Sequence, residues 1–216
     1  MTMDTTARAP AAPTVRPLVT LAVLGLIATS PAAVLAADLG ERLEKGEIVA
    51  TSVPGVGVRA GRAVALVAAP PRVLRDLLSA MAGYPTFVPQ ITASRQVKPN
   101  RFVMECEFPW PVNKTWAYVQ VQSGSREGAE VVTWKMLNGT LKSFEGVAWI
   151  QPWGKGQSLL TYQMLAVPHT VAPDGLMTGG LRDAVKEMVE AVRKQAARVL
   201  AANPGLRVAA EPSTTH

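Results

Sequence analysis

The chain has 216 residues, a hydrophobic fraction of 48% and a formal charge of +6. This length suits one domain with a processed end, and the hydrophobic fraction is sufficient for a substantial core. The basic residues are scattered, which argues against a nucleic-acid-binding arm, so we expect no nucleic-acid partner. A single cysteine and two histidines exclude an intramolecular disulfide and a structural zinc site, and we expect neither a metal nor a cofactor.

Residues 1–36 have the order of a secretory signal peptide. Two arginines precede an apolar run from Leu18 to Ala28, and small residues follow up to Ala36. This order predicts cleavage after Ala36 and export to the periplasm or the medium. An uncleaved anchor stays open as the alternative, although the apolar run is short for a membrane span. Residues 37–45 are expected to form a mature N-terminal tail, or one to two helical turns.

Strand-like runs separated by turn signals fill the middle of the chain. Runs at 46–53 and 58–68 precede a short helix, which begins near Pro71 and ends at Gly83-Tyr84-Pro85. The later runs cover 91–97, 101–108, 115–122, 130–137, 141–150 and 158–167. A hairpin turn is expected at Asn138-Gly139. Consecutive hairpins predict an antiparallel sheet, which we expect to have about six to seven strands.

An amphipathic helix from Leu181 to Leu200 closes the domain. Its apolar residues fall within one sector of about 100°, with charged residues opposite, and its length is about 30 Å. A long helix after a strand-rich chain must lay its apolar stripe on the sheet. The predicted fold class is therefore α+β: a curved antiparallel sheet wrapped around a long C-terminal helix, over residues 46–202. The remainder, 203–216, is expected to be disordered.

Four local phrases accompany this order of elements: Ala68-Ala69-Pro70-Pro71, Gly83 through Pro89, Gly146 through Pro152, and Leu160-Thr161-Tyr162. Together they resemble the START-like (SRPBCC) superfamily of helix-grip proteins, the polyketide cyclase/dehydrase and lipid transport group. Within that group the chain looks most similar to coenzyme Q-binding proteins. The resemblance covers about residues 46–200. It implies that a hydrophobic small molecule is held between the sheet and the long helix.

Methionine and aromatic residues supply material for such a cavity, because methionine is flexible and suits varied apolar ligands. The expected ligand-binding residues are Phe87, Phe102, Met104, Phe108, Trp134, Met136, Tyr162, Met164, Met177, Leu181, Val185 and Met188. For each of them simple core packing is the alternative. A gate is expected at Tyr84–Pro89 together with the crossing at Pro168–Thr178.

Polar residues support catalysis only weakly. Glu105 and Glu107 alternate away from the apolar face and are expected to be solvated. Glu145 could face either way, and His169 is expected to be a plain loop residue rather than a proton shuttle. Cys106 is expected to face the core as a small apolar residue, not as a nucleophile. We therefore predict no catalytic residue.

The favoured function is binding or carriage of a lipid-like molecule (a lipid, a quinone or a polyketide-like compound) outside the cytoplasm. A transient contact with a membrane surface is a further partner to consider. Two alternatives stay open. One is a cyclase/dehydrase-type enzyme acting on an apolar or aromatic substrate, which a buried carboxylate or histidine in the hollow would favour. The other is an accessory module that binds a protein partner.

Overall fold

The computed structural model describes residues 37–53, 60–107, 114–154, 156–169 and 174–206. The elements in chain order are α1 (Ala37–Glu44), β1 (Val49–Val53), β2 (Ala60–Val67), α2 (Pro71–Ser79), the 3-10 helix η3 (Met81–Thr86), β3 (Ile91–Lys98), β4 (Arg101–Glu107), β5 (Lys114–Arg126), β6 (Ala129–Gly139), β7 (Ser143–Trp153), β8 (Gln157–Val167) and α3 (Asp174–Ala202). The expected signal peptide at 1–36 lies outside the described residues. None of the described helices is both long and apolar enough to cross a membrane.

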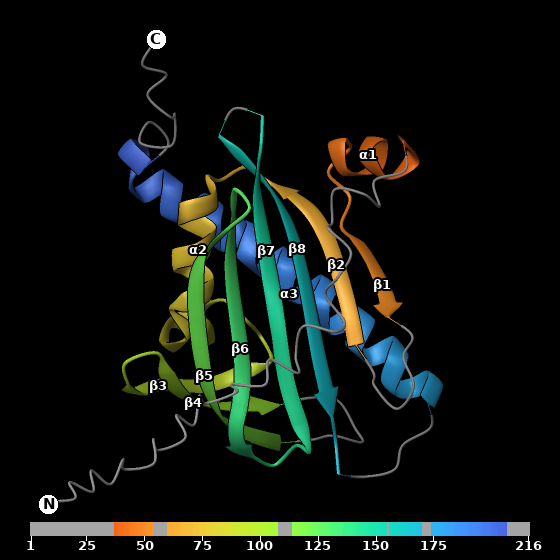
Figure 1. The fold of residues 1–216 in the computed structure, drawn as a ribbon, viewed down its shortest axis with the longest axis vertical. Helices are drawn as coiled ribbons and strands as arrows, with labels where there is room; N and C mark the ends of the chain where they lie inside the picture. Colours follow the sequence, from red (N-terminus) through yellow and green to blue (C-terminus); the bar gives the residue numbers. More distant parts are fainter. Residues whose placement is uncertain (1–36, 54–59, 108–113, 155, 170–173, 207–216) are drawn as a thin grey trace, which may run out of the picture. The chain divides into compact units, whose positions relative to one another are not determined.

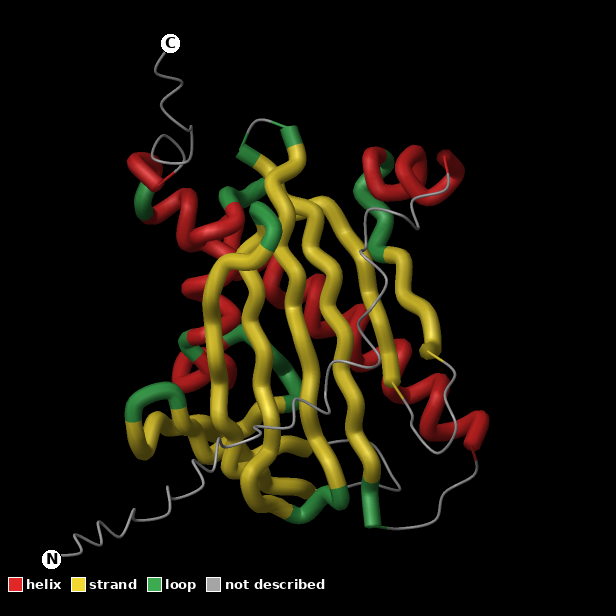
Figure 2. Tube along the Cα trace, viewed as in Figure 1, coloured by secondary structure: helices red, strands yellow, loops and turns green. Residues whose placement is uncertain are grey.

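The strands form one antiparallel sheet in the order β1-β2-β8-β7-β6-β5-β4-β3. Its strand number of eight exceeds the expected six to seven, because both edge strands, β1 and β3, also pair. The sheet is curved: β3 and β4 cross below the ends of the central strands, and α3 runs behind them (Figures 1 and 2). The predicted α+β fold, with a sheet wrapped around a long C-terminal helix, is confirmed.

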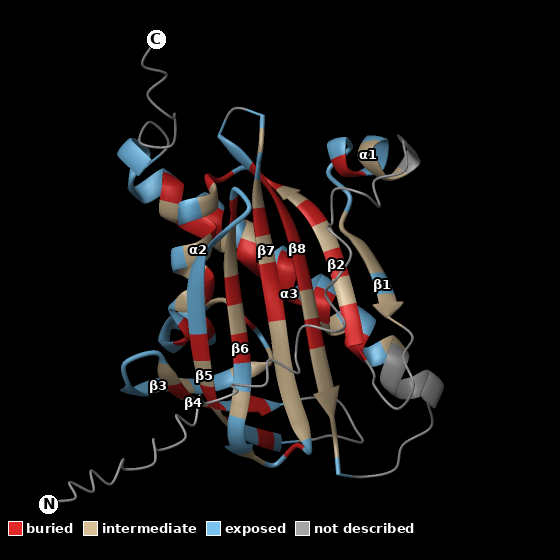
Figure 3. Ribbon diagram, viewed as in Figure 1, coloured by how far each residue is buried: buried red, intermediate tan, exposed pale blue. Residues whose placement is uncertain are grey.

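Helix α3 is 29 residues long and begins at Asp174, so it starts earlier than the apolar stripe alone predicts. Its stripe is buried as expected (Figure 3), and Val185, Val189 and Val192 are fully covered. Burial of each such side chain contributes about 1.5–3 kcal/mol. The helix crosses β2 closely at Gly61, where an added Cβ would lie 2.5 Å from the Leu181 carbonyl oxygen. The absence of a side chain at this position lets helix and sheet approach.

Both ends of the domain form short helical segments; at the first the sequence left a tail or one to two helical turns open, and at the second it predicted a disordered tail. Residues 37–44 form helix α1, the alternative to a tail, because Leu43 is fully buried. Arg193 of α3 ties this region down, donating hydrogen bonds to the Gly46 carbonyl at 2.8 Å and the Leu66 carbonyl at 3.0 Å. At the other end, residues 203–206 make a turn on the end of α3 instead of a disordered tail. Residues 207–216 lie outside the described residues.

The hairpin expected at Asn138-Gly139 is not there. Both residues belong to β6 and pair with Tyr118 and Ala117 of β5. The chain turns later, at 140–142, before β7 begins at Ser143. The 13-residue strand β5 is long enough to hold the end of β6 in the sheet, and this pairing overrides the local turn preference of the two residues.

Candidate functional site: an apolar pocket between the sheet and α3

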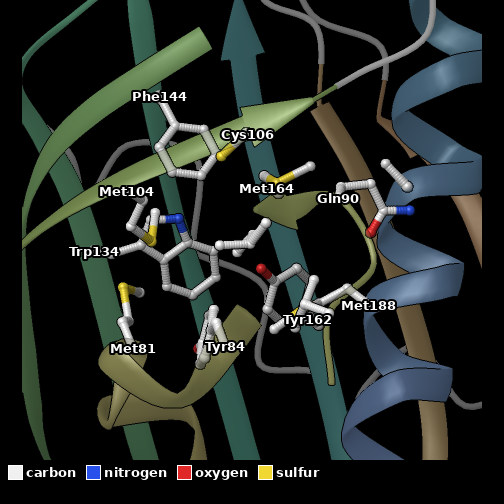
Figure 4. Close-up of a pocket in the computed structure, with 13 residues that line it drawn as sticks. Met81, Tyr84, Gln90, Met104, Cys106, Trp134, Phe144, Tyr162, Met164 and Met188 are labelled. Carbon is white, nitrogen blue, oxygen red and sulfur yellow. The ribbon is translucent and has the colours of Figure 1, made fainter. Parts of the chain in front are cut away.

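A small pocket of about 50 Å³ lies between the inner face of the sheet, η3 and α3. Strands β4, β6, β7 and β8 form one wall, η3 with the segment after it up to the start of β3 forms the second, and α3 forms the third (Figure 4). The lining residues are Met81, Tyr84, Val88, Gln90, Ile91, Met104, Cys106, Trp134, Phe144, Tyr162, Met164, Ala184 and Met188. Apart from Gln90 these side chains are aromatic, aliphatic or sulfur-containing, so the pocket suits an apolar ligand.

Trp134 and Tyr162 stack in the centre of the pocket. Their ring centroids are 5.0 Å apart and the rings are inclined by 27°. Strand pairing places Gly146 beside Trp134 on one side and Met164 on the other. The indole covers Gly146 so closely that an added Cβ would lie 2.6 Å from its Cε2 atom. The position of the indole therefore depends on glycine at 146.

Tyr84 anchors the 3-10 helix below the pocket. Its hydroxyl donates a hydrogen bond of 2.7 Å to the Leu78 carbonyl, and its ring meets Phe87 edge-on at 5.4 Å. Burial, with a smaller contribution from Tyr162, raises the pKa of Tyr84 well above its ordinary value. Tyr84 thus stays protonated and holds η3 against α2. Within the expected gate segment Tyr84–Pro89, this residue is a fixed point, whereas Pro85, Thr86 and Pro89 are exposed.

The second expected gate segment, Pro168–Thr178, is partly helical, because α3 begins at Asp174. Residues 170–173 lie outside the described residues. A direct contact between two walls of the pocket occurs at Gln90, in the segment between η3 and β3. Its side-chain amide donates a hydrogen bond to the Glu187 carboxylate of α3. This bond joins the segment before β3 to α3 beside Met188 (Figure 4). Opening the pocket along this side would require the bond to break.

Besides Gln90, three polar groups on the strands face or border the apolar space. The Trp134 Nε1 atom is buried and has no hydrogen-bond partner in the described part of the chain. Burial also raises the pKa of Tyr162, so its hydroxyl keeps its proton. Burial raises the pKa of the Cys106 thiol to about 11, against a smaller opposing effect of its hydrogen bond with Thr115. Cys106 is therefore a neutral thiol at physiological pH and a poor nucleophile, as expected from the sequence.

The structure brings together five of the expected ligand-binding residues around the pocket: Met104, Trp134, Tyr162, Met164 and Met188. Four others pack in or against the core without lining the pocket: Phe87, Phe102, Met136 and Val185. Leu181 is buried over Gly61. Phe108 and the side chain of Met177 lie outside the described residues.

The remaining lining residues were not among the sequence candidates. Met81, Tyr84 and Val88 come from η3 and its exit. The sequence marked this region as a helix end, and Tyr84 and Val88 as part of the expected gate, but it did not place their side chains in the lining. Phe144 could have been found by alternation in β7, since it lies two residues before Gly146 on the inner face. Ala184 could not, because a small residue on a helix gives no signal of its own.

The polar candidates for catalysis lie elsewhere. Glu105 and Glu107 are exposed, as predicted, and so is His169. Glu145 is half-buried and alternates with Phe144, so it lies on the face of β7 opposite to the pocket. No cluster of three or more histidine, cysteine or acidic side chains that could hold a metal ion occurs among the residues described.

Neither a family model nor a curated protein matches the sequence. Solved structures do match it. A START superfamily protein from Mycobacterium smegmatis superposes with a TM-score of 0.58 over 65% of this chain and 98% of its own, at 14% identity. A STAR-related lipid transfer protein from Xanthomonas axonopodis superposes with a TM-score of 0.61 over 69% and 93%, at 16% identity. The chain has the START-like fold. A protein from Thermus thermophilus shares this START-like fold at a TM-score of 0.53 and 18% identity, over 66% of this chain and 97% of its own.

At such identities the similarity shows the START-like fold alone. It confirms the helix-grip architecture and does not distinguish the coenzyme Q-binding branch, which stays a prediction.

Proposed function

We propose that the protein binds a hydrophobic, lipid-like small molecule in the pocket between the sheet and α3, and carries it outside the cytoplasm. The observation that carries the proposal is the lining, which contains four methionines and four aromatic side chains but no acidic, basic or imidazole side chain among the residues described. A pocket of this composition binds through apolar contact rather than through charge. The location outside the cytoplasm rests on the signal-peptide pattern of residues 1–36.

The pocket volume of about 50 Å³ is far smaller than a lipid chain. A cavity of roughly 150 Å³ is needed for a molecule the size of benzene. A larger ligand must therefore displace lining side chains. Met81, Met104, Met164 and Met188 are suited to this, because an unbranched methionine side chain changes rotamer at low cost. Each 100 Å² of apolar ligand surface that is buried contributes about 2.5 kcal/mol before the ordering costs of binding.

The proposal can be tested by native mass spectrometry of the mature protein purified from its exporting host, followed by extraction and analysis of any bound lipid. Met188 faces the pocket, so Met188→Trp should fill the space and remove the bound species. Lys186→Trp, on the exposed face of the same helix, is the matched control and should retain it. Circular dichroism would verify that both variants fold.

Two outcomes would contradict the proposed carrier function. If apolar ligands bind equally to Met188→Trp and Lys186→Trp, or do not bind saturably to the wild type, the pocket is not the carrier site. The protein-interaction alternative would then take precedence. If the purified protein converts an added apolar substrate to product and a heat-inactivated sample does not, the cyclase/dehydrase alternative is correct instead, and Tyr162 becomes its first candidate acid.

A further inference from the structure

We infer that the ligand is uncharged and carries a hydrogen-bond-accepting oxygen, such as a ketone or ester carbonyl, which accepts a hydrogen bond from the indole N–H of Trp134. This inference rests on the proposed function, because it names the ligand class for the same pocket. It is carried by the unpartnered Trp134 donor, by the fixed position of the indole, and by the absence of charge from the described lining.

The Trp134 side chain is only 4% exposed, and its Nε1 atom has no partner among the described residues. A buried donor without an acceptor loses its hydrogen bond to water and gains none in return, so buried tryptophans normally find an acceptor. The nitrogen lies on the edge of the indole nearest Met104 and Phe144, both of which line the pocket (Figure 4). Thioether sulfur is only a weak acceptor and a phenyl ring offers none in its plane. This edge of the pocket therefore presents a donor to whatever occupies it.

The indole cannot easily turn its N–H elsewhere. One face stacks on Tyr162, and the ring edge that carries Cζ2 and Cε2 lies over Gly146. Rotation would break the stack and drive the ring into neighbouring strand backbone. The donor is thus held in one orientation before binding, which reduces the ordering cost of a hydrogen bond to a ligand.

The described lining also selects against charge. It contains no arginine, lysine or histidine that could pair with an anion, and no carboxylate that could pair with a cation. Moving an unpaired carboxylate into such a site removes its hydration without giving it a partner, which strongly disfavours binding. The second polar group in the centre, the Tyr162 hydroxyl, keeps its proton because burial raises its pKa. Trp134 and Tyr162 thus both present neutral donor groups, and of these two Trp134 is the one whose donor has no partner among the described residues.

The test compares three chains of similar length: tridecan-2-one, tridecane and dodecanoate at a pH where it is ionised. Calorimetric titration gives the affinities for the wild type and Trp134→Phe, which keeps a ring but removes the donor. We expect the variant to bind the ketone about 3- to 10-fold more weakly, as expected for one net hydrogen bond, and the alkane within about 2-fold of wild type, because no hydrogen bond to it is lost. Dodecanoate should bind at least about 10-fold more weakly than the ketone. Trp149→Phe, on the opposite face of the sheet, is the matched control and should leave all three affinities unchanged.

An independent readout measures ligand binding on the wild-type protein and needs a variant only for assignment. The chain has five tryptophans, so a ¹⁵N-labelled sample gives few indole N–H resonances, and Trp134→Phe assigns one of them by its loss. The ketone should move this resonance downfield and the alkane should not.

The results separate the two proposals. If no chain binds in a manner that Met188→Trp abolishes, the proposed function fails. If the chains bind at that site but the indole resonance does not distinguish ketone from alkane, or dodecanoate binds as tightly as the ketone, the pocket is a carrier site and the inference about ligand chemistry is overturned.

Discussion

The substitution Gly146→Ala tests whether the pocket is built around the missing side chain at this position. Gly146 lies in β7 between Trp134 of β6 and Met164 of β8. An added Cβ would overlap the Trp134 indole at Cζ2 and would also overlap the Gln163 backbone carbonyl oxygen. The indole could move, but the carbonyl belongs to the adjacent strand of the sheet and could not. Overpacking of this kind typically costs about 1–3 kcal/mol.

We therefore expect Gly146→Ala to lower the free energy of unfolding by about 2 kcal/mol, which corresponds to a fall in Tm of roughly 4–8 °C for a chain of this size. The near-UV circular dichroism spectrum should also change, because the indole leaves its stack on Tyr162. Gly124→Ala is the control. Gly124 is also a strand glycine, in β5, but a Cβ added there meets nothing within 4 Å. Its replacement should be neutral or slightly stabilising.

A double-mutant cycle locates the effect. In a Trp134→Ala background the overlap with the indole is gone, while the overlap with the Gln163 carbonyl remains. Gly146→Ala should then cost at least about 1 kcal/mol less than in the wild type. Equal costs in both backgrounds, or a wild-type cost no larger than that of Gly124→Ala, would refute the account of how Trp134 is held.

Three further predictions concern other parts of the molecule. Val189→Asp places an unpaired charge at a fully buried position of α3 and should lower the free energy of unfolding by at least about 3 kcal/mol. Lys186→Asp, on the exposed face of the same helix, should be nearly neutral. Equal melting temperatures for the two variants would contradict the packing of this helix on the sheet. The thiol of Cys106 has an ordinary pKa of 9.0, raised to about 11 by burial. The contribution of the protonated thiol to stability is therefore present below pH 9 and is lost as the pH rises toward 11. In urea denaturation, the free energy of unfolding of Cys106→Ala should fall less steeply over this pH range than that of the wild type. Equal slopes of unfolding free energy against pH for the two proteins would contradict this prediction. Finally, N-terminal sequencing of the exported protein should begin at Ala37 or Asp38, and recovery of Met1 in the exported fraction would disprove cleavage.

The fold was predictable because its signals are periodic and local. The apolar positions of α3 recur at helical spacing, and strands such as β4 alternate strictly, with Phe102, Met104 and Cys106 buried and Glu105 exposed. Such patterns specify which face of each element is covered. The errors lie where long-range pairing decides. Asn138-Gly139 has the local chemistry of a turn, but β5 extends far enough to keep it in the sheet.

Arg193, on the charged face of α3, is a second case in which contacts with distant segments override the local sequence pattern. Its place in the helical pattern predicts a solvated side chain, yet it is half-buried and hydrogen-bonded to two backbone carbonyls of distant segments. Burial lowers its pKa, against a smaller opposing effect of Glu190. The partners are main-chain groups, which carry no sequence signal, so only the folded arrangement of α1, β2 and α3 reveals them.

The pocket itself illustrates why a cavity is harder to predict than a core. Candidates chosen for size and flexibility line the pocket where the strand or helix face was correctly assigned, as for Met164 and Met188. However, a hollow also requires small residues at the right places, and these look unremarkable in a sequence. Gly146 leaves room for the indole of Trp134, and Ala184 leaves room on α3 opposite the sheet. The position of the donor in the pocket is therefore determined by a glycine on the neighbouring strand, so the ligand preference inferred for Trp134 depends on two residues that act together rather than on tryptophan alone.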